Sequence, residues 1–101
     1  MPRRIILTPE AESDAREAFS WYEEQDRGLG DEFLSCLELA FFQIAQNPRQ
    51  YPVRFDSFRR ILVRRFPYSV YFDYDTNSIY VYYIFHCSQD PEKLGKRLSG
   101  T

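Results

Sequence analysis

The chain has 101 residues, of which 44% are hydrophobic and 28% charged, a composition that fits a globular domain and excludes a disordered tail. The formal net charge at pH 7 is −2, but residues 1–50 carry −5 and residues 51–101 carry +3, so the second half is the one suited to face an anion. No uncharged apolar stretch approaches the roughly 18 residues of a membrane span, and the run at residues 5–7 is too short for a signal peptide, so we expect a cytoplasmic protein.

The first part of the chain predicts a strand followed by a helix. Residues 4–7 form a short apolar run with two isoleucines, which is typical of a strand. Thr8 and Pro9 then supply an N-cap and a proline at the first helical position. Apolar residues at helical spacing continue until Gly28 and Gly30 turn the chain.

A second amphipathic helix is predicted from near Asp31 to just before Asn47 and Pro48, because the residue before a proline is pushed out of the helical region. Since only a short glycine turn separates the two helices, we expect an antiparallel helix hairpin. The apolar stripe of the second helix includes Phe33, Leu34, Leu37 and Phe41.

The second half of the chain changes from a helical to an alternating pattern. Residues 48–58 are predicted to form a loop, and residues 59–66, 68–74 and 79–86 alternate as three strands. The connections between these strands are short, which favours antiparallel pairing. A last helical turn is expected to begin at Asp90.

Together these elements predict one α+β domain over residues 1–101, with an N-terminal strand, an antiparallel helix hairpin and a three-stranded antiparallel meander. Alternation assigns to the inner face of the sheet Ile61, Val63, Val70, Phe72, Val81 and Phe85. The opposite face is expected to carry Arg60, Arg64, Tyr71, Tyr80, Tyr82 and His86.

The opposite face is where we expect function, because arginines alternate there with tyrosines. Guanidinium groups neutralise phosphates or carboxylates, and phenol rings offer planar surfaces for stacking. Cross-strand tyrosine pairs also stabilise an exposed sheet by themselves. At this point a protein partner, a nucleic acid and a purely stabilising role all stay open.

The residue types and their spacing give little support for a catalytic or a metal site. Cys36, Cys87 and His86 form no zinc-ligand pattern, and we expect free thiols, no metal and no cofactor. His86 and Cys87 are neighbours in a predicted strand, so their side chains point to opposite faces and do not form a dyad. If His86 acts on a phosphodiester, Arg64 or Arg65 has to supply charge stabilisation.

Several segments together resemble the RelE/ParE superfamily of type II toxin–antitoxin toxins, often labelled plasmid-stabilisation proteins. They are PEAE at residues 9–12, AQNP at residues 45–48, RRFPYSVYF at residues 64–72 and IFHCSQDP at residues 84–91. The resemblance covers nearly the whole chain and implies the same fold, a helix hairpin on an antiparallel sheet. It also implies a growth-inhibiting toxin silenced by an antitoxin whose carboxy-terminal segment wraps the toxin.

Within this superfamily, RelE-like members cleave mRNA on the ribosome with basic residues on the central strands, an arginine after the last strand and a tyrosine near the C-terminus. Here Ser69 stands where those nucleases commonly have arginine, residues 87–90 hold no basic side chain, and no tyrosine follows Tyr83. Only Arg60 and Arg64 match positions of the right type. These departures favour the ParE-like branch, whose members inhibit DNA gyrase by binding.

The resemblance therefore implies two contact regions and leaves alternatives. The helix stripe Phe33, Leu34, Leu37 and Phe41 is expected to serve the core and the antitoxin groove. The target is expected to contact Arg59, Arg60, Arg64, Arg65, Tyr68 and Tyr71. The alternatives are a ribosome-dependent mRNA endonuclease using Arg60, Arg64 and His86, or a degenerate member without toxicity; a homodimer or a hetero-oligomer with the antitoxin stays open.

Overall fold

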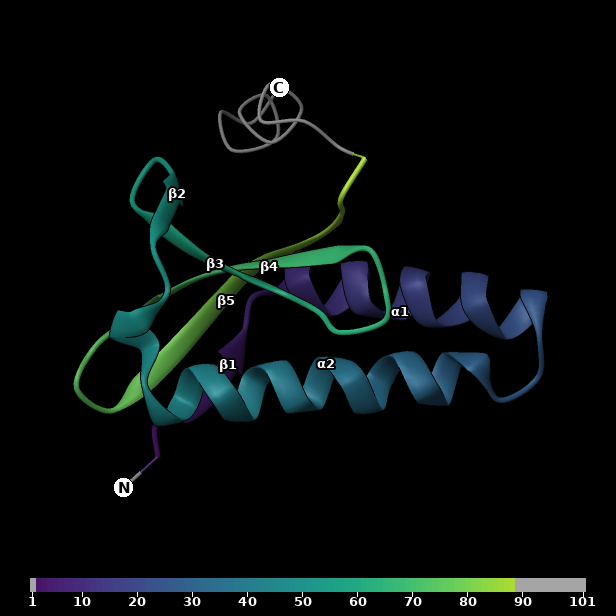
Figure 1. Ribbon diagram of the computed structural model, residues 1–101, viewed down its shortest axis with the longest axis horizontal. Coiled ribbons are helices and arrows are strands. Elements are labelled where there is room, and N and C mark those ends of the chain that lie inside the picture. Colours follow the sequence, from purple (N-terminus) through teal and green to yellow (C-terminus); the bar gives the residue numbers. More distant parts are fainter. Residues whose placement is uncertain (1, 89–101) are drawn as a thin grey trace.

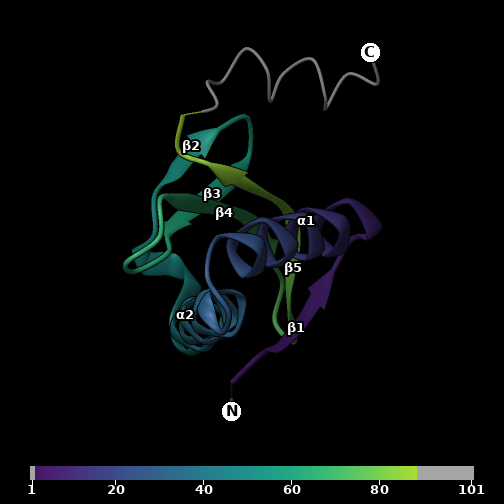
Figure 2. The same cartoon turned by 90° about the vertical axis from the view of Figure 1, so that its right-hand side faces the viewer.

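The computed structural model describes residues 2–88. A five-stranded sheet with the strand order β1-β5-β4-β3-β2 is covered on one face by two helices (Figures 1 and 2). The elements are β1 (Arg4–Leu7), α1 (Pro9–Gln25), α2 (Leu29–Gln46), a 3-10 turn (Pro48–Gln50), β2 (Val53–Phe55), β3 (Phe58–Leu62), β4 (Tyr68–Tyr74) and β5 (Ser78–His86). The predicted α+β class and the antiparallel order of the last three strands are confirmed; in addition, β1 joins β5 in parallel, which makes the sheet mixed. The helical turn predicted from Asp90 lies outside the described residues.

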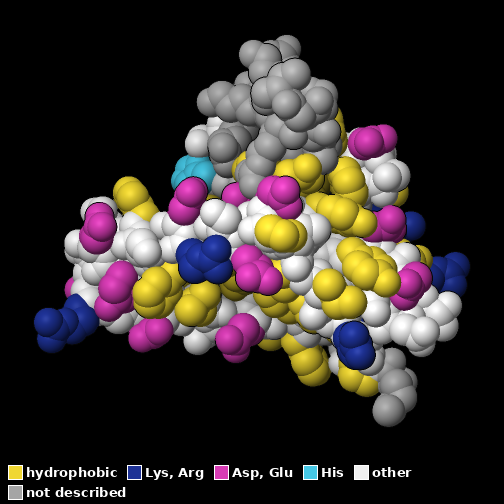
Figure 3. Space-filling model, turned by 180° about the vertical axis from the view of Figure 1, so that it is seen from behind, with side chains coloured by type: hydrophobic (Ala, Val, Ile, Leu, Met, Phe, Trp, Pro, Cys, Tyr) yellow, Lys and Arg dark blue, Asp and Glu magenta, His cyan; other side chains and the backbone are white. Residues whose placement is uncertain are grey.

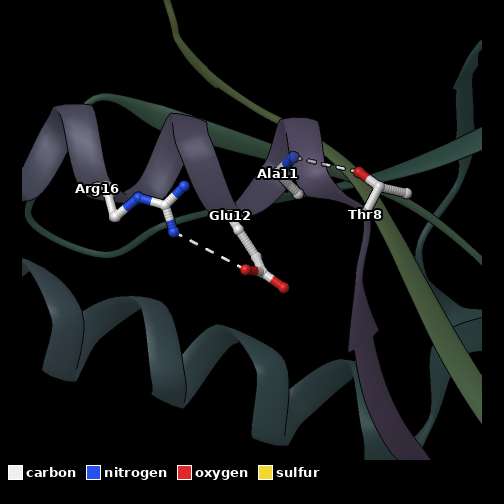
Figure 4. A network of polar contacts seen from close by, with 4 residues as sticks. All are labelled: Thr8, Ala11, Glu12 and Arg16. Carbon is white, nitrogen blue, oxygen red and sulfur yellow. Dashed lines mark hydrogen bonds and ion pairs between the residues drawn. The ribbon is translucent and has the colours of Figure 1, made fainter.

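The start of α1 follows the sequence prediction. Thr8 Oγ1 accepts a hydrogen bond of 3.1 Å from the backbone N–H of Ala11, and Pro9 occupies the first helical position (Figure 4). The same hydroxyl donates to the backbone oxygen of Tyr82 at 3.1 Å, so the cap also attaches α1 to β5. Glu12 and Arg16 form an exposed ion pair of 3.8 Å one turn further along (Figure 4).

The turn between the helices is tighter than predicted, because α2 begins at Leu29 and not near Asp31. Gly28 adopts a left-handed conformation with φ of 91°, which permits the sharp reversal. The carboxylate of Glu23 accepts hydrogen bonds of 3.0–3.1 Å from the N–H groups of Gly28 and Gly30, so it caps the start of α2 from α1.

Residues 48–58 are not the loop that the sequence predicts. They contain the 3-10 turn and β2, which pairs antiparallel with β3 at the sheet edge. The three residues of β2 are too few to show an alternating pattern, and Pro52 immediately before them resembles a loop signal.

The strand predicted at residues 59–66 ends early, at Leu62. Arg65 has a left-handed φ of 69°, and the backbone N–H of Tyr68 donates a hydrogen bond of 2.8 Å to the backbone oxygen of Phe66, so residues 63–67 form a tight turn. Val63 and Phe66 are buried nonetheless, with 6% and 7% of their surface exposed. The turn therefore breaks the alternation of a strand and still buries two apolar side chains, at positions three residues apart.

A β-bulge in β5 changes which side chains face the helices. Tyr71 pairs with Tyr83 but Phe72 pairs with Val81, so Tyr82 is the extra residue. Beyond the bulge Ile84 faces the helices opposite Val70, whereas the predictions that Phe85 lies on the inner face and His86 on the outer one are wrong. The register shift by one residue exchanges the faces of the last part of β5.

The core lies between the sheet and the two helices. Its largest fully buried side chains include Phe33 and Ile44 from α2 and Phe72, Ile79 and Val81 from the sheet. The rings of Tyr22 and Phe33 stack at 5.5 Å, which joins the helices near the turn that connects them. Among the described residues neither helix is long and apolar enough to cross a membrane.

The β4–β5 hairpin is closed by one carboxylate. Asp75 Oδ1 accepts hydrogen bonds from the N–H groups of Asn77 (2.9 Å) and Ser78 (2.8 Å), and its Oδ2 accepts one from the Tyr80 hydroxyl (2.8 Å). The hydrogen bond from Asn77, followed by those from Tyr80 and Ser78, lowers the pKa of Asp75 below its ordinary value. The ionised form of Asp75 therefore stabilises the hairpin.

We expect Asp75→Asn to destabilise the fold at neutral pH and to lose this effect in acid. Because the pKa of Asp75 is lower in the folded state, its stabilisation is present above the unfolded-state pKa and disappears as the pH falls through the folded-state pKa. Urea unfolding of both proteins between about pH 7 and about pH 2.5 measures the difference. Asp56→Asn in the β2–β3 turn is the matched control, and a difference for Asp75→Asn that does not depend on pH would contradict the prediction.

Candidate functional site

Two of the six predicted target contacts, Arg60 and Tyr71, lie directly opposite each other on neighbouring strands. Arg60 of β3 pairs with Tyr71 of β4, and both side chains are half-buried on the face of the sheet away from the helices. Arg60 makes no side-chain hydrogen bond or ion pair with another residue of the described part. Its guanidinium is therefore available to a partner.

Five aromatic side chains on this face form a cluster beside Arg60, and we call them the outer aromatic face; Tyr80 lies on the same face nearer the β4–β5 turn, where it binds Asp75. The Tyr83 and Phe85 rings stack at 5.4 Å with an interplanar angle of 7°, and Tyr71 meets Phe85 at 6.3 Å. Phe58 contacts Tyr82 at 4.8 Å. The bulge creates this cluster, because it brings Tyr82 and Tyr83 to the same side of the sheet. The outer aromatic face consists of Phe58, Tyr71, Tyr82, Tyr83 and Phe85.

Arg59 lies on the helix side of the sheet and not on the outer face. Its guanidinium donates hydrogen bonds to the backbone oxygens of Tyr51 (2.6 Å) and Arg49 (3.4 Å) and lies 5.4 Å from the ring centre of Tyr74. These contacts hold the segment before β2 against the sheet edge. The Arg59 guanidinium therefore already has partners within the fold.

Arg65 and Arg64 lie in the turn between β3 and β4. Arg65 donates a hydrogen bond of 2.8 Å to Glu32 Oε1, and this bond, together with the carboxylate charge, raises the pKa of Arg65. The ion pair attaches the turn to α2, although both side chains are at least half exposed. Arg64 is exposed, and its side chain makes no hydrogen bond or ion pair within residues 2–88.

Tyr68 belongs to the helix side of the sheet. Its ring contacts Phe33 at 5.0 Å, Tyr22 at 6.0 Å and His86 at 5.3 Å. Burial is the main reason why the pKa of Tyr68 is raised, with smaller contributions from Tyr22 and from the carboxylates of Asp14 and Glu17. Tyr68 and Arg60 therefore do not form one surface.

A basic cavity of about 350 Å³ opens beside β3 at the edge of the sheet. Arg54 and Arg60 contribute positive charge to it, and no Asp or Glu occurs among its described lining residues. The cavity is lined by Gln43, Tyr51, Pro52, Arg54, Arg60, Ile61 and Leu62. Arg54 is not among the predicted contacts, because nothing in the alternating pattern of the strands connects it to Arg60.

The three residues of the nuclease alternative do not converge. Arg60 lines the basic cavity, whereas His86 lines another cavity together with the carboxylates of Asp14 and Glu17, and Arg64 lines neither. His86 Nδ1 accepts a hydrogen bond of 3.0 Å from the backbone N–H of Ser88. A phosphate near His86 would face two carboxylates, which is unfavourable for stabilising a developing negative charge. No cluster of three metal-ligating side chains occurs in the described part of the chain.

The predicted antitoxin residues divide between core and surface. Phe33 and Leu37 are buried with 0% and 3% exposure, whereas Leu34 and Phe41 are partly exposed. Leu34 lines a groove of about 380 Å³ between α1 and α2, together with Ala15, Arg16, Phe19 and Ser20. Figure 3 shows the molecule from behind, where hydrophobic side chains lie scattered among acidic ones.

Comparison with known proteins gives one family and one fold. The family described as the ParE toxin of type II toxin–antitoxin systems, parDE, matches residues 5–91. Among solved structures, a chain of the chromosomal ParDE TA system from P. aeruginosa is similar with a TM-score of 0.72 and 16% identity, over 83% of this chain and 95% of that one. No curated protein is similar enough to match.

Proposed function

Because the chain belongs to the ParE toxin family of type II toxin–antitoxin systems, we propose that it arrests growth by binding a protein target, with DNA gyrase as the first candidate. We further propose that it acts in the cytoplasm and that a cognate antitoxin neutralises it. In this proposal the toxin inhibits by occupying its target and carries out no chemical step.

The pairing of Arg60 with Tyr71, which belongs to the outer aromatic face, is the observation that carries the proposal. Arginine and tyrosine are, with tryptophan, enriched at the energetic centre of protein interfaces, because each combines a large apolar area with a directed polar group. On this sheet the rings are held by one another, so little conformational freedom is lost on binding.

The antitoxin is proposed to occupy the groove between α1 and α2. Its walls are formed largely by Ala15, Phe19 and Leu34, which suits the apolar side of an amphipathic segment. This part of the proposal keeps Leu34 from the predicted stripe, while Phe33 and Leu37 are buried in the core and do not line the groove. Phe41 is partly exposed elsewhere on α2.

A ribosome-dependent mRNA endonuclease is the second candidate, favoured only by the positive charge that Arg54 and Arg60 give the basic cavity. The position of His86 among carboxylates disfavours it.

Controlled expression tests the toxin assignment. Inducing the chain alone should stop growth, and co-expressing the product of the neighbouring reading frame should restore it. Normal growth after induction of soluble, folded protein would contradict the proposal and favour a degenerate family member. Growth arrest that the neighbouring product does not relieve would contradict the antitoxin part.

We expect His86→Ala to leave growth inhibition within about twofold of wild type, because binding through Arg60 and Tyr71 does not need His86. The same induction assay measures the effect, with circular dichroism as the check on folding. Complete loss of inhibition by a folded His86→Ala protein would instead favour the nuclease alternative.

A further inference from the structure

A polar cavity of about 310 Å³ lies between α1 and the adjoining ends of β4 and β5. It is separate from the basic cavity and from the helix groove. Its described lining residues include two acids and no lysine or arginine: Asp14, Glu17, Ala18, Trp21, Tyr68, Ile84, Phe85 and His86.

The two acids are Asp14 and Glu17, which lie three residues apart and so on one side of α1. Asp14 Oδ2 accepts a hydrogen bond of 3.0 Å from the backbone N–H of Ile84, which holds this carboxylate at the sheet. Glu17 is exposed and makes no hydrogen bond or ion pair with another described residue. Both carboxylates raise the pKa of Tyr68, so their negative charge acts across the cavity.

Aromatic rings form the other walls. The Trp21 side chain is 55% exposed, although its ring is held edge-to-face against Tyr22 at 5.1 Å and 84°. Tyr68 contributes a second ring and packs at 5.0 Å against the core residue Phe33. An accessible tryptophan ring next to carboxylates combines a stacking surface with negative charge, and together they attract a cation that can stack.

We propose that this cavity binds an arginine side chain of a protein partner. A guanidinium group is planar, so it can lie over the Trp21 ring while its N–H groups donate to the Glu17 carboxylate. Lysine satisfies the charge but neither the stacking nor the paired hydrogen bonds, which makes arginine the better fit. The site recognises a positive partner segment, whereas the Arg60 face recognises a different surface.

Trp21 is the only tryptophan of the chain, so its fluorescence reports on this cavity directly. The probes are N-acetylarginine amide and its neutral analogue N-acetylcitrulline amide, titrated into the full-length protein. We expect a saturable change with the arginine probe in the millimolar range and at least about fivefold weaker binding of the citrulline probe.

Glu17→Gln should weaken binding of the arginine probe about fivefold, whereas Glu24→Gln, exposed on the same helix outside the cavity, should stay within about twofold. Equal binding of the two probes, no saturable change, or unchanged binding by folded Glu17→Gln would overturn the proposal. Growth arrest and its relief by the antitoxin do not depend on this result, so the toxin assignment is tested separately.

Discussion

Gly30→Ala should cost about 2 kcal/mol of unfolding free energy, although alanine is the better helix former. A Cβ atom at Gly30 would lie 2.8 Å from the ring carbons and from the backbone oxygen of Phe19. The backbone oxygen cannot rotate away as a side chain does, so α1 and α2 have to separate at this contact. The gain in helix propensity offsets only part of this overlap.

Urea denaturation compares Gly30→Ala with wild type, and Gly28→Ala serves as the matched control. At Gly28 nothing lies within 4 Å of the position that a Cβ atom would take, and the cost comes only from the left-handed φ of 91°, about 1 kcal/mol. Gly30→Ala should therefore be the less stable of the two variants. An unchanged midpoint for Gly30→Ala would contradict the close approach of the helices.

Arg60→Glu should abolish growth inhibition while the protein stays folded. Arg60 lies at the centre of the proposed interface opposite Tyr71, and replacing a central arginine of this kind costs about 2 kcal/mol or more, roughly 30-fold or more in affinity. The reversed charge adds repulsion to the loss. The stability of the variant should change little, since Arg60 makes no side-chain hydrogen bond or ion pair with another described residue.

Growth after induction and affinity for purified gyrase measure this effect. Arg27→Glu, exposed in the turn between the helices and away from the sheet, carries the same charge change and should retain inhibition. Full inhibition by Arg60→Glu, or equal loss by Arg27→Glu, would show that the Arg60 face is not the interface with the target.

The sequence allowed the helix hairpin to be predicted well, because its signals are local. Thr8 and Pro9 begin α1, and Asn47 and Pro48 follow the end of α2, where capping and proline geometry act within a few residues. Gly30 shows the limit of such signals. The sequence predicts Gly30 to be a turn residue, yet it lies inside α2, where the absence of a side chain permits the close contact with Phe19.

The sheet was less predictable at the places that shape the candidate site. The bulge at Tyr82 lies within a run of tyrosines, and either residue of the pair Tyr82 and Tyr83 fits an alternating strand. The non-local pairing with β4 decides which of the two tyrosines is the extra residue. As a result Phe85 and His86 lie on the faces opposite to those predicted. The polar cavity between α1 and the ends of β4 and β5 also depends on this exchange, since His86 lines it only because it faces α1.

The predicted target contacts differ in whether another residue of the protein already binds their side chains. Arg59 is held by backbone oxygens and Arg65 by Glu32, and neither partner can be inferred from an alternating pattern. Arg64 is exposed in the turn, while Arg60 has no described polar partner for its side chain. The family resemblance depends on the order of several loose motifs, and the match over residues 5–91 confirms it.

The most direct test adds purified wild-type chain to DNA gyrase in a supercoiling assay and, in parallel, maps mRNA ends on translating ribosomes. We expect that supercoiling stops, that the Arg60→Glu variant leaves it active, and that the mRNA stays whole. Transcripts cut at ribosomal positions while gyrase keeps full activity would contradict inhibition by binding.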